Sequence, residues 1–178
     1  IALWADADGD HKGDYLQTAG KVKSQFGNIY IYGEKIQMFK GSIQSFAGSI
    51  SLKAAKNILL LGNVQTTLGK IVVDGSSLKI YKTIRGGTVA LRARTGSITG
   101  SGKAIGTTAV SLDAYTDIGT EKDPFDVDAG ILAAVTKKDD IYLNALNSAE
   151  AGPVSAINLK FGLPEGASNM PTAAARAQ

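Results

Sequence analysis

The sequence contains no cysteine and only one histidine, His11. The absence of cysteine excludes a disulfide framework, a zinc–thiolate site and a cysteine nucleophile. A single histidine inside an acidic segment does not support a Ser-His-Asp triad. The chain has only 4 prolines in 178 residues, so it is not a proline-rich linker. Several large classes of enzyme and of small secreted scaffold are therefore ruled out.

Long hydrophobic runs and helical patterns are also missing. The apolar run Ile58 to Leu61 ends at Gly62, and the runs at 1–5 and 131–135 are only one residue longer. All are far shorter than the roughly 20 residues that a membrane-spanning helix needs. No amphipathic pattern is long enough for the helices of an alternating βαβ fold. The formal net charge is +3, but lysine and arginine are scattered singly, whereas a nucleic-acid interface gathers them on one face. We therefore expect no membrane span and no nucleic-acid partner.

What the sequence does contain is glycine, at 21 positions, and a repeat that runs between the glycines. Residues 88–93 (TVALRA) align with residues 109–114 (AVSLDA) at an offset of 21. The same alternation of apolar and polar residues begins at Ile29, Ile50 and Ile71, again 21 apart, and then at Val89 after 18. Alternation with period two, closed by glycine, is typical of short β-strands.

A second series of strands falls between the first. Its leading apolar residues are 22, 20, 20 and 20 apart in the sequence and are Ile36, Ile58, Leu78, Ile98 and Ile118. One coil of this length cannot bury its inward side chains alone, but stacked coils pair each strand with its equivalents above and below. The two series predict an all-β fold, a parallel β-solenoid with coils of about 20 residues.

The repeat sets the predicted domain limits. We expect a single solenoid over residues 1–162, with about seven or eight coils. After Gly119 the spacing loosens, and separate strands are predicted at 125–128, 131–135, 140–145 and 156–162. Residues 163–178 are expected to form an extended tail or cap, which could contact a neighbouring subunit. The chain opens in mid-strand at Ile1, as expected of a mature product or of a piece of a longer protein.

Five parts of the repeat carry a family resemblance: residues 87–91 (GTVAL), 96–102 (GSITGSG), 117–120 (DIGT), 124–127 (PFDV) and 140–143 (DIYL). Together with the opening ADADGD of residues 5–10, they resemble repetitive bacterial surface proteins of the filamentous-haemagglutinin type. The resemblance implies a right-handed parallel β-helix and secretion to the bacterial cell surface. It further implies a structural or adhesive role.

The opening acidic segment is the candidate metal site. Carboxylates alternate here with small residues, and glycines at 9 and 13 allow the loop to turn, as a hard cation such as Ca²⁺ prefers; the candidate ligands are Asp6, Asp8, Asp10 and Asp14. The sixth and twelfth positions counted from Asp6 hold His11 and Gln17, so this is not an EF-hand loop. The alternative is an acidic turn in which Asp and Gly only satisfy turn geometry.

No catalytic residue is predicted, and we expect a protein that is not an enzyme. The expected function is a rigid extracellular rod that associates end to end with copies of itself, because a solenoid end exposes strand edges. One alternative is a monomeric module that binds cell-surface glycans. The other is a carbohydrate-active β-helix enzyme, which needs clustered carboxylates on a lateral groove. The candidates for such a cluster are Asp113, Asp117, Asp123, Asp126 and Asp128.

Overall fold

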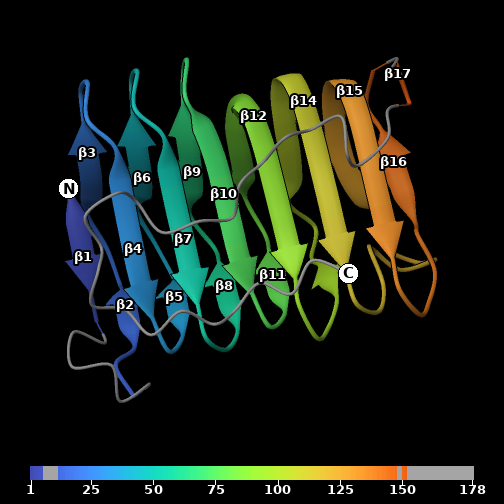
Figure 1. Cartoon of the computed structure of the whole chain (residues 1–178), viewed down its shortest axis with the longest axis horizontal. Coiled ribbons are helices and arrows are strands. Elements are labelled where there is room, and N and C mark those ends of the chain that lie inside the picture. The colour runs from blue at the N-terminus through green and yellow to red at the C-terminus, as the bar shows by residue number, and fades with distance from the viewer. Residues whose placement is uncertain (6–11, 148–149, 152–178) are drawn as a thin grey trace.

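The computed structural model describes residues 1–5, 12–147 and 150–151, and this part of the chain is entirely β-structure and turns. The chain winds as a parallel β-solenoid whose strands stack along one long axis (Figure 1). From β1 to β15 it completes about six turns, with coils about 21 residues long. The predicted fold class is confirmed. The predicted seven or eight coils were counted up to Gly162, and residues 152–162 lie outside the described part.

Each coil contributes to three faces, which we name A, B and C. Face A consists of β1 (Ala2–Trp4), β4 (Ile29–Gly33), β7 (Ile50–Ala54), β10 (Lys70–Gly75), the second halves of β12 (Thr83–Ala93), β14 (Lys103–Ala114) and β15 (Phe125–Thr136), and β17 (Glu150–Ala151). Face B consists of β2 (Tyr15–Gln17), β5 (Ile36–Met38), β8 (Ile58–Leu60), β11 (Leu78–Ile80) and β13 (Ile98–Thr99). Face C consists of β3 (Lys21–Ser24), β6 (Ser42–Ser45), β9 (Asn63–Thr66), the first halves of β12, β14 and β15, and β16 (Leu143–Ala145).

The register of the strands follows the sequence repeat. On face A, Ile50 pairs with Ile29 and with Ile71, and Ile71 pairs with Val89. On face B, the second predicted series forms one column in which Ile36, Ile58, Leu78 and Ile98 pair in turn, and Ile118 continues it through bridges to Ile98 and Ile141. Inward positions of all three faces form one continuous core of Ile, Leu, Val and Ala. Stacking like residues lets each coil bury the apolar side chains of its neighbours.

The interval between Ile71 and Val89 is 18 residues instead of 21, and two of the three missing residues are lost at one corner. In the early coils a turn separates face C from face A. In the third coil this turn takes four residues, which lie between Gln65, the end of the pairing with β12 on face C, and Lys70, the start of the pairing with β12 on face A. In the next coil Arg85 pairs with Gln65 and Thr88 pairs with Lys70, which leaves only Gly86 and Gly87 between them. A β-carbon on Gly87 would lie 3.2 Å from the carbonyl oxygens of Leu68 and Gly69, so glycine permits this close corner. In β12, β14 and β15 the chain therefore runs from face C to face A in one long strand.

Two predicted strand boundaries were wrong. The strands expected at 125–128 and 131–135 form one strand, β15, because the shortened corner lets the ladder continue around it. The strand expected at 140–145 is confined to β16, with an isolated bridge at Ile141. The strand expected at 156–162 and the tail expected at 163–178 lie outside the described residues.

Across the residues that the structure describes, no helix has the length and apolar character needed to span a membrane.

Candidate functional site

The predicted acidic loop is only partly described. Asp6, Asp8 and Asp10 lie outside the described residues. Asp14 is described, and its carboxylate lies 3.5 Å from the Lys35 ammonium and accepts a hydrogen bond of 3.1 Å from the Lys35 backbone N–H. This contact ties the first coil to the second. Among residues 1–5, 12–147 and 150–151 no group of three or more His, Cys, Asp or Glu could hold a metal, and the calcium site stays a prediction.

The carboxylates considered for a catalytic cluster are spread over the molecule. Asp113 lies on face A in β14, Asp117 accepts a hydrogen bond of 3.3 Å from the Ser97 hydroxyl, and Asp123 lies in an exposed turn. Asp126 and Asp128 are two residues apart in β15 and so share the outer side of face C. The described fold thus brings together two of the five.

Face A carries a column of alternating charge. The backbone register places Lys53, Asp74, Arg92 and Asp113 side by side on successive coils. Asp74 is buried, and its carboxylate accepts two hydrogen bonds from the Arg92 guanidinium, at 2.6 Å and 3.3 Å. Arg94 lies 3.5 Å from the same carboxylate and also donates to the Ala54 carbonyl. Opposite charges on adjacent strands stabilise their pairing, so this column strengthens the stack.

Burial changes the protonation chemistry beside this column. Partial burial lowers the pKa of Lys53, and the neighbouring Asp74 carboxylate acts against that shift. One coil earlier Tyr32 is fully buried, and burial raises its pKa to about 12. The Tyr32 ring stacks on Tyr30 at 6.4 Å and meets Trp4 edge to face at 5.9 Å. The three aromatic residues Trp4, Tyr30 and Tyr32 thus form a packed cluster on face A.

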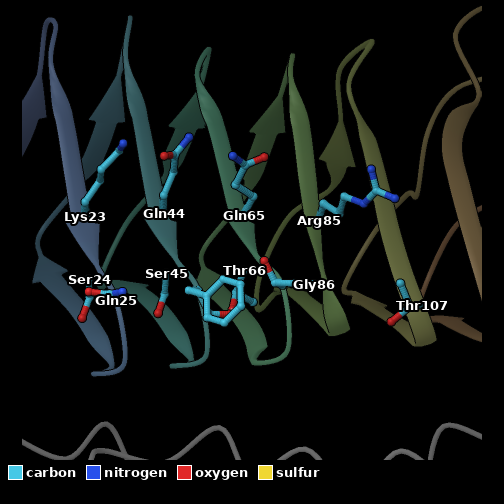
Figure 2. A pocket seen from close by; sticks show the side chains of 12 residues that line it. Lys23, Ser24, Gln25, Gln44, Ser45, Gln65, Thr66, Arg85, Gly86 and Thr107 are labelled. Carbon is cyan, nitrogen blue, oxygen red and sulfur yellow. The ribbon is translucent and has the colours of Figure 1, made fainter.

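Face C carries the one groove that we single out, and it crosses the strands along the solenoid axis. It has a volume of about 660 Å³ and extends from Lys23 in the first coil to Thr107 in the fifth. Its upper row is made by four long side chains whose backbones pair in register: Lys23 with Gln44, Gln44 with Gln65, and Gln65 with Arg85. Figure 2 shows these side chains side by side, with Ser24, Ser45, Thr66 and Thr107 in a lower row.

The lower row is held by the corner turns. The Ser45 hydroxyl donates to the Gly27 carbonyl at 3.2 Å and accepts from the Gly48 N–H at 3.0 Å. Thr66 repeats the motif one coil later, donating to the Gly48 carbonyl at 2.9 Å and accepting from Gly69 at 3.1 Å. Because these hydroxyls are engaged with backbone, they fix the turns that form the wall of the groove. Phe46 stands in this wall with 53% of its surface exposed.

Within residues 1–5, 12–147 and 150–151, the strands at the two ends of the solenoid pair on one side only. In the described part of the chain β1, β2 and β3 each pair with one strand only, that of the second coil. The inward residues Leu3, Tyr15 and Val22 are only partly buried. At the other end Leu143 is partly buried, while Ile141 and Leu146 are each 42% exposed. In the part of the chain that the structure describes, both end coils therefore combine strand edges paired on one side with apolar side chains.

No family model, curated protein or solved structure matches this chain.

The function of the solenoid must therefore come from its own geometry. Sequence reasoning missed the groove, although a signal was present: Lys23, Gln44, Gln65 and Arg85 are 21, 21 and 20 residues apart, the same period as the core positions. Polar residues that follow the coil period lie in one outward column, just as apolar residues at that period lie in one inward column. The period alone did not show that the corner turns stand beside this column as a wall.

Proposed function

We propose that this protein is a structural and adhesive rod of the bacterial cell surface, which associates end to end with copies of itself. The observation that carries the proposal is that, among the described residues, the end coils of a parallel, in-register stack each pair on one side only. A strand edge with unpaired N–H and C=O groups is a template for another strand, and the first coil of one copy has the same parallel geometry as the coil that would follow the last coil of another. Head-to-tail contact of this kind does not close, so it produces filaments.

Apolar side chains at both ends support the same pairing. Leu3, Tyr15 and Val22 project toward the core from the first coil, and Leu143 does so from the last described coil. Stacking two copies would complete the burial of these side chains, which is the main favourable contribution to association. The resemblance of the repeats to haemagglutinin-type surface proteins agrees with an extracellular rod.

Charge on face C favours the head-to-tail orientation. Lys21 and Lys23 lie in the first coil, and Asp126 and Asp128 lie in the last long strand. In a head-to-tail stack these groups would come within a few strand spacings of each other, about 10 Å, which is comparable to the Debye length in physiological salt. Copies meeting head to head or tail to tail would place like charges together. The charge pattern therefore selects one orientation among those that the strand edges allow.

Negative-stain electron microscopy of the purified chain tests this proposal. We expect filaments one solenoid wide at neutral pH. Replacing both acidic residues of face C in β15, Asp126→Lys with Asp128→Lys, should shorten the filaments or slow their growth. Asp123→Lys, in an exposed turn, is the control. Monomers of constant size at all concentrations, in wild-type protein with its complete chain, would refute end-to-end association.

A further inference from the structure

The groove on face C is a row of side chains that do not bond to the rest of the described protein. Lys23, Gln65 and Arg85 are exposed and Gln44 is half-buried. Within the described residues the four side chains make no hydrogen bond or ion pair. Neighbouring rungs are separated by about 4.8 Å, so the two cations stand three rungs, or about 14 Å, apart with two amides between them. Such a row offers regularly spaced hydrogen-bond groups to a linear ligand.

The charge of this face is of one sign over most of its length. β3, β6, β9 and the first halves of β12 and β14 carry Lys21, Lys23, Arg85 and Lys103 and no Asp or Glu. Carboxylates appear only in the sixth rung, at Asp126 and Asp128. A groove with cations and no carboxylate in its own strands attracts an anion. The charge of the groove therefore favours an acidic ligand.

The spacing and the aromatic content of the groove decide between classes of acidic polymer. A nucleic-acid strand carries one phosphate per about 3.4 Å, and its single-stranded form is held by a series of stacked aromatic side chains. The groove has one cation per about 14 Å along its upper row and a single aromatic residue, Phe46. Sparse charge, amide and hydroxyl groups and one flat apolar ring suit a chain of sugars in which some units are acidic.

We propose that this groove binds a linear acidic polysaccharide, with the sugar chain lying along the solenoid axis. Lys23 and Arg85 bind carboxylate or sulfate groups, Gln44 and Gln65 exchange hydrogen bonds with sugar hydroxyls, and Phe46 stacks against a ring. The in-register ladder beneath and the fixed corner turns hold these groups in place before the ligand arrives, which lowers the entropy cost of binding. This inference specifies the adhesive part of the proposed function and is independent of filament formation.

Calorimetric titration of the full chain with acidic and neutral polysaccharides tests the inference. Alginate serves as the uronate probe, heparin as the sulfate probe, and dextran as the neutral control. We expect binding to at least one acidic probe, none to dextran, and weakening as salt is raised. The probe that binds more tightly identifies the acidic group. Equal binding of dextran, or tighter binding of single-stranded DNA than of both acidic probes, would overturn the inference.

Matched variants locate the site. Lys23→Gln combined with Arg85→Gln should weaken binding about tenfold or more, because two charge-assisted contacts are lost. Lys70→Gln combined with Lys79→Gln makes the same change in net charge at exposed positions outside the groove and should change affinity less than about twofold. Phe46→Ala should weaken binding, whereas Phe26→Ala, at a more exposed phenylalanine in the preceding corner turn, should not.

A gain of affinity provides a test that misfolding cannot imitate. Gln65→Arg adds a cation to the middle of the row and should tighten binding of the acidic probe. If the groove and control variants bind alike, or if Gln65→Arg has no effect, the groove is not the site. Filaments scored for Arg85→Gln and Phe46→Ala, each made alone, separate the two proposals, since these residues lie in interior coils. Lys23 is left out of this comparison because it also belongs to the charged end coil.

Discussion

The buried carboxylate of Asp74 offers a sharp test of how the coils are held together. It is only 1% exposed and carries two hydrogen bonds from Arg92 and an ion pair with Arg94. Asp74→Asn keeps the size of the side chain and removes its charge, which leaves Lys53 of one neighbouring coil facing Arg92 and Arg94 of the other. Breaking a buried ion pair by removing one partner costs about 3–5 kcal/mol.

The arginines reduce the expected effect, because their side chains are 20% and 25% exposed and water reaches them. For a chain of this length each kcal/mol lowers the melting temperature by about 2–4 °C. Multiplying this by the cost of about 3–5 kcal/mol gives a range for the fall in melting temperature. Because the arginines are partly exposed, we expect Asp74→Asn to lower the melting temperature by about 6–12 °C, in the lower part of that range. The assay is thermal unfolding followed by circular dichroism, at protein concentrations where filaments do not form.

Asp113 provides the matched control in the same column of face A. It is half-buried, and it makes no ion pair with another described residue. Asp113→Asn should therefore shift the melting temperature by about 2 °C or less. A cycle of Asp74→Asn with Arg92→Gln should give a coupling energy above about 1 kcal/mol. Equal shifts for Asp74→Asn and Asp113→Asn, or a coupling near zero, would refute the idea that Asp74 clamps the coils.

Three further predictions concern the core, the turns and alkaline pH. Ile71→Ala, in the buried column, should lower the free energy of chemical unfolding by about 2–5 kcal/mol. Leu68→Ala, three residues earlier and 69% exposed, should lower it by about 0.5 kcal/mol or less. Similar losses for the two variants would contradict the assigned inward register. Gly100 has φ +113°, and a β-carbon there would collide with the Ile80 carbonyl. Gly100→Ala should therefore lower the melting temperature more than Gly20→Ala, where φ is +81° and the space is open. The reverse order in melting temperature would count against this geometry. Tyr32 has its pKa raised to about 12, so the neutral phenol favours the folded state, and this stability is present below about pH 10 and lost as pH rises toward 12. Tyr32→Phe should remove that loss in alkaline melting curves, and an unchanged pH profile would show that Tyr32 is not its source.

Much of the fold was predictable because it repeats. The period carried by Ile29, Ile50 and Ile71 predicted the register that these residues adopt. A parallel stack places equivalent positions of successive coils directly above one another, so sequence distance and spatial order coincide. The same reasoning was weaker where the period changed. The joining of the two strands predicted at 125–128 and 131–135 depended on how the corner at Ala129 and Gly130 closes, a local geometry that sequence spacing does not reveal.

For the candidate sites, too, some features follow from the sequence and others only from the tertiary structure. The sequence by itself determined the all-β solenoid, the length of its coils and the inward columns, because burial demands apolar residues at the coil period. Only the tertiary structure decided which outward columns matter, since a polar residue at that period can be a solvated position, a buried clamp such as Asp74, or a rung of a groove such as Gln65. Outward side chains acquire a role from the turns and strands beside them. Those neighbours are brought together by the winding of the chain, about 20 residues away in sequence.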